Sequence, residues 1–245
     1  MQLECYQKGR PSLRPPTFLS GISRTGTTSR TSIAYDALKN SIISNQVKPG
    51  DYLSENQLAL SLGMSRTPIR EAIKLLAGEG FLEIHNGVGI FVKQVTTREI
   101  SDLFEVRAAL ECAALHTSLD NITENEIDDA IKEWTKLKII FDANQEIDIN
   151  HMLDLDVKLH LMIIDRCKNE FLKNLIDGIR SKISRYQKIS VMALSNTRDT
   201  IDQHLEILHC MKKRDSEVTS VILREHIRKA ALYIINSPNW VVPSA

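Results

Sequence analysis

The sequence predicts a mainly α-helical protein in which an N-terminal winged helix-turn-helix precedes an all-helical antiparallel bundle. Three observations predict this fold class. Two short helical patterns that meet at Gly63 are followed by two β-rich runs around residues 86–89. From residue 97 onward, apolar residues recur at helical spacing, and Gly178 is the one glycine in that half. The breaks between these later helices are short, as in bundles of antiparallel neighbours.

The first half of the chain contains the signals that start and stop short helices. The residues Thr31-Ser32 are suitable N-caps for a helix over residues 33–42, and Ser54 and Ser65 are suitable caps for the next two helices. Pro68 is tolerated in the first turn of the third helix, which ends in the segment 78–80. The residues 86–89, Asn-Gly-Val-Gly, predict a hairpin between strands over 82–85 and 90–95.

The second half predicts six helices of ordinary length. Their expected bounds are about 97–119, 123–142, 146–167, 169–193, 198–213 and 215–236. Together with composition, this pattern divides the chain into four parts. We expect a disordered basic tail over 1–30, a winged helix-turn-helix over 31–95, a helical domain over 96–238, and a tail over 239–245. Residues 1–30 could instead form a basic arm that contacts phosphates.

The composition is that of an ordinary soluble protein. The chain has 245 residues, 42% of them hydrophobic and 25% charged, with a formal net charge of zero. It has neither an apolar run of about 18 residues nor the apolar core of a secretory signal, so we expect a cytoplasmic protein with no membrane partner. The four cysteines are scattered, which favours reduced thiols over disulfides or a cysteine metal site: Cys5, Cys112, Cys167 and Cys210.

The N-terminal end of the third helix has the residues that a DNA-reading helix needs. Arg66 and Arg70 lie four residues apart and therefore on one helical face, where each could contact guanine or a phosphate. Ser65 and Thr67 suit phosphate oxygens at the helix N-terminus. Gly87, in the wing, allows the backbone to approach DNA closely. These residues predict a double-stranded DNA partner.

Four residues on the apolar faces of three later helices predict a metal site. Asp156 and His160 are four residues apart and share one helical face. His204 and His226 each lie on an apolar stripe of a later helix. A single inward histidine is usually a core residue, but three with a carboxylate favour a divalent metal ion. The remaining helical-domain histidines do not share such a pattern, and we expect them not to be ligands: His116, His151 and His209.

Arg107 also lies on an apolar stripe, where a buried guanidinium needs an anionic partner. Glu111, one turn further on, is one candidate for that partner. A carboxylate of a bound effector is the other.

The sequence resembles a known family in both halves. The run SRTPIREAIKLLAGEGFLE, followed by GVGIFV, resembles the winged helix-turn-helix of GntR-type transcriptional regulators. The D-x-x-x-H pattern, followed by the histidines in QHLEIL and REHI, resembles the FCD effector domain of one GntR subfamily. Gln203 departs from the common pattern, in which an acid often precedes this histidine.

The resemblance implies a homodimeric transcriptional regulator, in most cases a repressor, that binds an operator. It implies that Ser65, Arg66, Thr67, Arg70 and Gly87 contact DNA, and that the metal ligands are Asp156, His160, His204 and His226. It also favours a small organic acid that reaches the metal and Arg107. Zinc suits imidazole-rich sites best, and nickel, manganese and iron also fit such ligands. The alternatives are a metal-dependent hydrolase and a metal with a purely structural role.

Overall fold

The computed structural model describes residues 29–192 and 197–236, in two compact units. The chain divides between Gln94 and Val95. The expected N-terminal tail lies outside the described residues except for Ser29 and Arg30, and the expected tail over 239–245 lies entirely outside them. Within the described residues, no helix is both long and apolar enough to cross a membrane.

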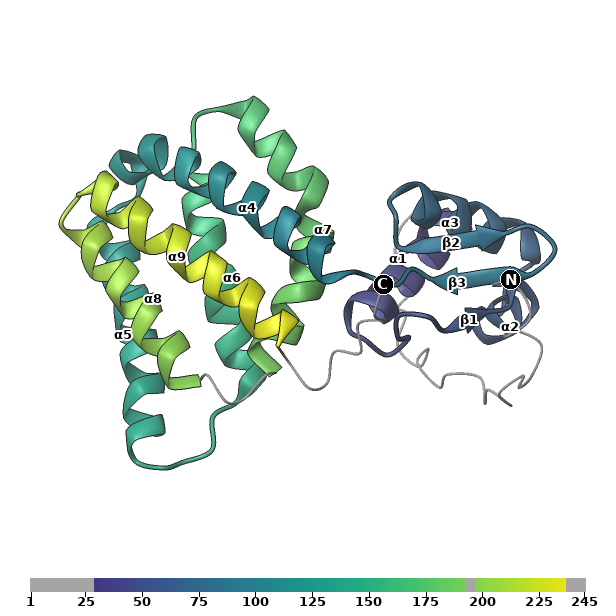
Figure 1. The fold of residues 1–245 in the computed structure, drawn as a ribbon, viewed down its shortest axis with the longest axis horizontal. Helices are drawn as coiled ribbons and strands as arrows, with labels where there is room; N and C mark the ends of the chain where they lie inside the picture. The colour runs from purple at the N-terminus through teal and green to yellow at the C-terminus, as the bar shows by residue number, and fades with distance from the viewer. Residues whose placement is uncertain (1–28, 193–196, 237–245) are drawn as a thin grey trace. The chain divides into compact units, whose positions relative to one another are not determined.

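The N-terminal unit combines three helices with a small antiparallel sheet (Figure 1). The helices are α1 (Arg30–Ile43), α2 (Glu55–Leu62) and α3 (Arg66–Gly78). The strands are β1 (Tyr52–Leu53), β2 (Leu82–His85) and β3 (Gly89–Val92), in the spatial order β1-β3-β2. Helix α3 packs against α1 and α2 and buries an apolar stripe that includes Ile69, Ile73 and Leu76.

Local signals explain most of these boundaries, with two exceptions. The Ser54 side chain caps α2, and Gly63 ends it in a left-handed conformation at φ 61°, as expected. However, α1 begins at Arg30, because the hydroxyl of Ser29 accepts the N–H of Ser32. The expected cap at Thr31-Ser32 was therefore wrong by two to three residues. Ser65 occupies the N-cap of α3 but makes no side-chain capping hydrogen bond.

The wing is the turn between β2 and β3. The N–H of Val88 donates to the carbonyl oxygen of His85 at 3.0 Å, and Gly87 has a φ of 76°, which favours glycine. Gly89 has a φ of 149°, and a Cβ atom there would lie 2.3 Å from Cε2 of Tyr52. The wing therefore requires glycine at position 89 for two reasons, the backbone angle and the Tyr52 ring.

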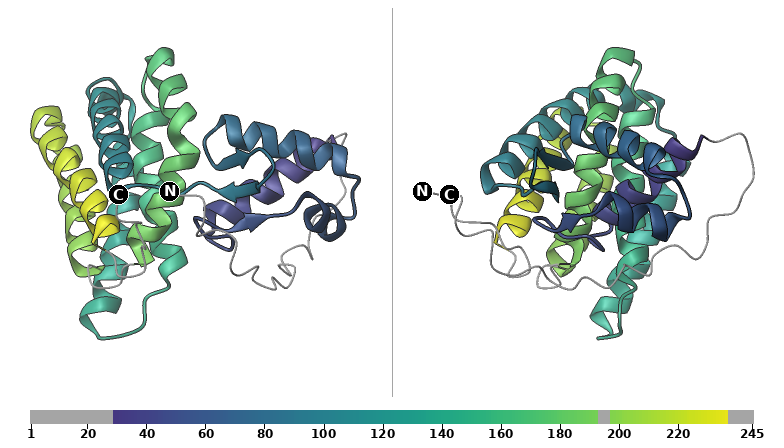
Figure 2. Two further views of the ribbon diagram at one scale, coloured as in Figure 1. Left: turned by 45° about the vertical axis from the view of Figure 1, so that its right-hand side comes forward. Right: turned by 90° about the vertical axis from the view of Figure 1, so that its right-hand side faces the viewer.

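The C-terminal unit is a bundle of six helices within the described residues, with one short 3-10 turn, η2 (Leu119–Asn121). The helices are α4 (Thr97–Ser118), α5 (Glu124–Asp142), α6 (Ile149–Asp165), α7 (Glu170–Met192), α8 (Thr197–Lys212) and α9 (Ser216–Ile235). Helix α4 packs against α6, α7 and α9, and α5 packs against α6 and α8. Figure 2 shows the bundle from two further sides.

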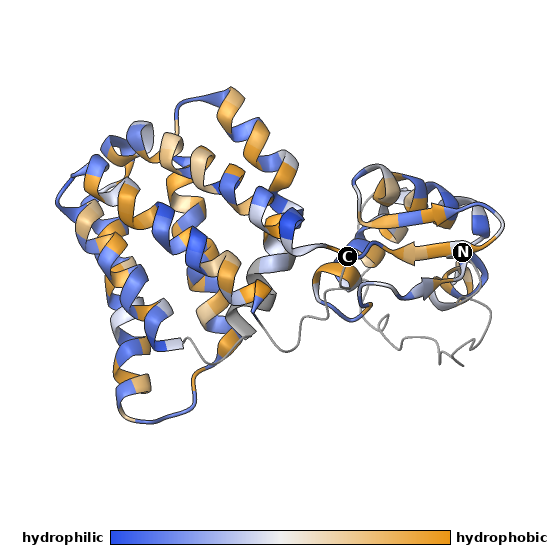
Figure 3. Cartoon of the chain, viewed as in Figure 1, coloured by the Kyte–Doolittle hydropathy of each residue, from blue (hydrophilic) through white to orange (hydrophobic). Residues whose placement is uncertain are grey.

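Each bundle helix has mixed hydropathy along its length (Figure 3), and the apolar side chains fill one continuous core. This core is interrupted by buried polar side chains from α4, α6, α8 and α9, among them Arg107, Glu111, Asp156, His160, His204 and His226. Burying six ionisable groups costs free energy unless they are paired or bind an ion. Their grouping marks the interior of the bundle as the candidate site.

Candidate metal centre and DNA-binding surface

The carboxylate and three histidines that the sequence singles out come together inside the bundle. Asp156 and His160 extend from α6, His204 from α8 and His226 from α9. Each offers one potential ligand atom, and these atoms all lie within 4.8 Å of one another. All four side chains are buried. An Asp with three His is a donor set that zinc and other divalent transition metals bind.

The second nitrogen of each imidazole is occupied by an oxygen acceptor. Nδ1 of His160 lies 2.5 Å from a carboxylate oxygen of Glu111, Nδ1 of His204 lies 2.7 Å from the carbonyl oxygen of Thr200, and Nδ1 of His226 lies 2.9 Å from Oε1 of Gln203. Because oxygen acceptors need a proton, each Nδ1 carries a hydrogen. The Nε2 atoms remain for other partners: Nε2 of His204 lies within hydrogen-bond distance of Asp156, and Nε2 of His160 has no hydrogen-bond partner.

Together with Asp156, these imidazoles form a group that could hold a metal ion. Nε2 of His204 lies 3.0 Å from Oδ1 of Asp156, and Nε2 of His160 lies 3.9 Å from the same oxygen. Without a metal, a proton on Nε2 of His204 can donate to Asp156; a metal ion would replace that proton and take the lone pair. Nε2 of His160 has no hydrogen-bond partner although it is buried. A divalent ion would use all four groups, and the acceptors on Nδ1 hold the rings in the orientation that metal-binding histidines usually have.

The protonation states agree with a ligand role. Burial lowers the pKa of His226 well below its ordinary value, and the nearby charges of His204 and His160 lower it further, so this ring is neutral. Burial alone would raise the pKa of Asp156, but the hydrogen bond from His204 and the nearby positive charges outweigh it and keep the pKa low. A carboxylate and a neutral imidazole are the forms that bind metals.

Trp134 forms one wall of the site. Its ring stacks on His204 with the centroids 3.9 Å apart and an angle of 13° between the planes. The Trp134 side chain comes from α5 and is almost fully buried, so it restricts both water and the rotation of the His204 ring.

Arg107 and Glu111 form a buried ion pair next to the metal ligands. Nε of Arg107 donates to Oε1 of Glu111 at 2.6 Å, while Oε2 of Glu111 accepts from His160. Burial raises the pKa of Glu111, but the charges of Arg107 and His160 outweigh this effect and lower it overall. Glu111, one of the two candidate partners of Arg107, is therefore its partner in the structure. Nη2 of Arg107 is buried without a partner, so the guanidinium can still contact an anion.

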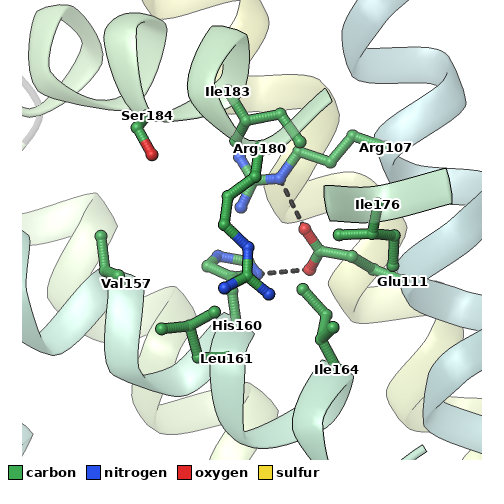
Figure 4. Close-up of a pocket in the computed structure, with 10 residues that line it drawn as sticks. All are labelled: Arg107, Glu111, Val157, His160, Leu161, Ile164, Ile176, Arg180, Ile183 and Ser184. Atoms are coloured by element: carbon green, nitrogen blue, oxygen red, sulfur yellow. Dashed lines mark hydrogen bonds and ion pairs between the residues drawn. The ribbon is translucent and has the colours of Figure 1, made fainter. Parts of the chain in front are cut away.

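A small cavity of about 60 Å³ adjoins this ion pair (Figure 4). Arg107, Glu111 and His160 line it together with residues of α6 and α7. The cavity thus lies beside a candidate metal ligand and beside Arg107, for which the family resemblance favours an effector carboxylate. Arg180 of α7 also lines the cavity.

The candidate DNA-contacting residues are exposed. Ser65, Arg66, Thr67 and Arg70 all lie exposed at the start of α3, and Gly87 lies exposed in the wing. These five residues therefore lie on the surface of the N-terminal unit, as contact with DNA requires.

Two residues of α2 hold these arginines in place, and sequence analysis missed both. Arg70 makes two hydrogen bonds to the Glu55 carboxylate, at 3.1 and 2.9 Å, and Arg66 donates to Oδ1 of Asn56 at 3.2 Å. Glu55 and Asn56 are separated from their arginines by 15 and 10 positions, so no helical spacing connects them. The one available signal was the short turn between the second and third helices, which places the two helices close together.

The remaining histidines of the bundle lie outside the metal-ligand cluster. His116, His151 and His209 are exposed. Nε2 of His116 lies 3.3 Å from the Ser220 hydroxyl, and Nε2 of His151 lies 3.9 Å from a Glu133 oxygen.

Comparison with known proteins assigns both halves to characterised domain types. Residues 30–92 match the family of bacterial regulatory proteins of the gntR type, and residues 102–229 match the FCD domain. The Nta operon transcriptional regulator of Aminobacter aminovorans is 30% identical over 187 residues, which span 76% of this chain and 86% of that protein. The HTH-type transcriptional repressor RspR of Escherichia coli (strain K12) is 23% identical over 195 residues, 80% of this chain and 84% of that protein.

A solved structure shows the same fold. The McbR/YncC protein of E. coli superposes with a TM-score of 0.66 at 22% identity, covering 85% of this chain and 98% of that one. The FCD match alone covers more than half of the chain. The chain belongs to the GntR family of bacterial regulatory proteins, as a DNA-binding transcriptional regulator with an FCD domain.

Proposed function

We propose that this regulator is a repressor whose FCD domain binds one divalent metal ion and a small organic acid that changes its affinity for an operator. The observation that carries the proposal is the convergence of Asp156, His160, His204 and His226, with every Nδ1 already bonded to an oxygen acceptor. Zinc suits this set best, and nickel, manganese and iron are the alternatives. Repression is supported by RspR, which is named as a repressor.

The organic acid would bind beside the metal, against Arg107. Four protein ligands would leave two positions open on a six-coordinate nickel, manganese or iron ion, and one position on zinc that expands to five ligands; carboxylate oxygens fill such positions well. Arg107 adds an unpaired buried N–H in a residue that lines the adjacent cavity. When bound, the metal supplies positive charge for the carboxylate, and Arg107 orients it.

DNA binding would use the exposed start of α3 and the wing. Arg66 and Arg70 would enter the major groove, Ser65 and Thr67 would contact phosphates, and Gly87 would let the wing backbone approach DNA. A homodimer would present two such surfaces to two operator half-sites in the cytoplasm. The acid would shift the population of the dimer between forms that match and mismatch the half-site spacing.

Metal analysis tests the centre of this proposal. We expect protein purified without an affinity tag to hold about one metal ion per chain, and His204→Ala/His226→Ala to lose it. His151→Ala/His209→Ala removes two exposed histidines instead and should keep the metal. Equal metal content in all three proteins would contradict the site. Metal-dependent turnover of an ester or amide would favour a hydrolase over a regulator.

A further inference from the structure

Three buried side-chain nitrogens without a hydrogen-bond partner belong to residues around the cavity beside the metal ligands. They are Nη2 of Arg107, Nε of Arg180 and Nε2 of His160. If the metal takes the His160 lone pair, two N–H donors remain. Figure 4 shows Arg107 and Arg180 extending toward Glu111 and His160. Buried donors are rarely left unpaired, so the cavity fits an acceptor that reaches both arginines.

The cavity limits the size of that acceptor. Its volume of about 60 Å³ is small for a ligand pocket. A short carboxylate of about two to four carbon atoms, on the order of acetate to butyrate, suits this space better than a tricarboxylate or a sugar acid.

The lining limits the chemistry of the rest of the molecule. Apart from Arg107, Glu111, His160 and Arg180, the lining consists of five aliphatic side chains and one hydroxyl, from Val157, Leu161, Ile164, Ile176, Ile183 and Ser184. A second carboxylate or several hydroxyls would lose hydrogen bonds to water and find few partners here. An alkyl end instead gains from contact with these side chains.

The charges also favour a single carboxylate. Arg107 is already paired with Glu111, and Arg180 lies 2.8 Å from Asp177 and 3.9 Å from Asp165. A divalent ion bound by Asp156 and three neutral histidines has one positive charge in excess. One monocarboxylate neutralises it, whereas a dicarboxylate would bury an uncompensated negative charge.

We propose that the effector is a short aliphatic monocarboxylate whose carboxylate lies between Arg107, Arg180 and the metal and whose alkyl end contacts Ile176 and Ile183. This proposal rests on the proposed function, because it specifies the organic acid of the same site. It also assigns Arg180, on α7, as a binding residue.

Calorimetric titration of the zinc-loaded full chain with butyrate, succinate and gluconate tests the ligand class. Butyrate and succinate share a four-carbon chain and differ by a carboxylate in place of a methyl group. We expect butyrate to bind roughly tenfold or more tightly than succinate, and gluconate not to bind measurably. Tighter binding of succinate or gluconate would overturn the monocarboxylate proposal and leave the effector function intact. Failure of all three acids on metal-loaded protein would overturn both.

Variants of α7 test the binding residues. Arg180→Met keeps the aliphatic stem and should weaken butyrate binding roughly tenfold to a hundredfold without changing zinc content. Arg166→Met removes a surface arginine that pairs with Glu126 and should leave butyrate binding unchanged. Ile183→Ala should shift the preference toward acids longer than butyrate. Wild-type affinity in folded Arg180→Met, or an unchanged chain-length preference in Ile183→Ala, would overturn the assignment.

Discussion

Glu111 is the residue at which stability and metal binding depend on the same carboxylate. One of its oxygens accepts from Nε of Arg107 at 2.6 Å and the other from Nδ1 of His160 at 2.5 Å, and the side chain is 2% exposed. Glu111→Gln keeps the shape but replaces one acceptor by an NH₂ donor. A donor then faces either the Arg107 guanidinium or the His160 N–H, and Arg107 becomes a buried cation without its counter-ion.

The expected cost follows from these contacts. Removing one partner of a buried ion pair costs about 3–5 kcal/mol, which is a large part of a total stability of about 5–15 kcal/mol. Urea unfolding of the metal-free protein measures this cost as a lower midpoint at an unchanged slope. Glu133→Gln, which removes an exposed partner of Lys136, is the matched control and should change the midpoint little.

Zinc affinity provides the second measurement. Glu111 fixes the proton of His160 on Nδ1, and loss of such a partner typically weakens metal binding about 10–100-fold. Competition with a chelator measures this change. A Glu111→Gln protein that unfolds at the wild-type urea concentration and binds zinc with wild-type affinity would refute the reasoning about both contacts.

Three further predictions concern DNA binding, the wing and pH. Arg66→Ala and Arg70→Ala should each weaken specific operator binding by about 1–3 kcal/mol in a gel-shift titration if these arginines read bases. Glu55→Gln should weaken binding less, because it only releases Arg70 from its ion pair. Unchanged gel shifts for both arginine variants would exclude the two arginines from the interface. Gly89→Ala should destabilise the N-terminal unit, because the added Cβ meets the Tyr52 ring. Gly178→Ala in α7 meets nothing within 4 Å and should stabilise the protein by up to about 1 kcal/mol. Thermal unfolding measures both variants, and a Gly89→Ala protein more stable than Gly178→Ala would contradict the wing geometry. The folded-state pKa of His226 lies below its ordinary value of 6.5. The contribution of this residue to the stability of metal-free protein is therefore fully present above pH 6.5 and is lost as pH falls toward the folded-state pKa, with a slope of up to about 1.4 kcal/mol per pH unit. Urea unfolding between about pH 7.5 and about pH 5.5 should show this decline in the wild type and less of it in His226→Asn.

The helices could be predicted from the sequence because their signals are local. Thr123 and Glu126 form a capping box at the start of α5, and the Asp215 side chain caps α9, each within three residues of its partner. Strand β1 could not be predicted in this way. Its two residues, Tyr52 and Leu53, form a strand through pairing with β3, some 37 positions later in the chain.

The candidate metal ligands could also be predicted, for a different reason. The apolar stripes around His160, His204 and His226 indicate which face of each helix is buried. Because these faces pack into one core, the three histidines on them are expected to lie near one another. The partners of these ligands depend on how far each helix is shifted along its neighbours. Glu111 on α4 reaches His160 on α6, and Gln203 on α8 reaches His226 on α9, at distances that no single-helix pattern contains.

Gln203 shows what this difference means for function. Gln203 provides an amide at the position where the family pattern often has an acid. In the structure its Oε1 accepts from Nδ1 of His226, so the amide still fixes the proton on that ring. It does so without adding a negative charge, which leaves the excess positive charge of a metal-loaded site for an incoming carboxylate.

A carboxylate bound at this site would influence DNA binding through α4. Arg107 and Glu111 both lie on this helix, and its first residue, Thr97, follows the boundary between the two units at Gln94–Val95. An acid that binds Arg107 interacts directly with the element that connects the bundle to the DNA-binding unit along the chain. A ligand shifts an equilibrium only through different contacts in its two states, so an acid at Arg107 would act if the Arg107–Glu111 pair lies differently relative to His160 in the two states. The same pair that stabilises the metal-free bundle is then the element through which an effector would act.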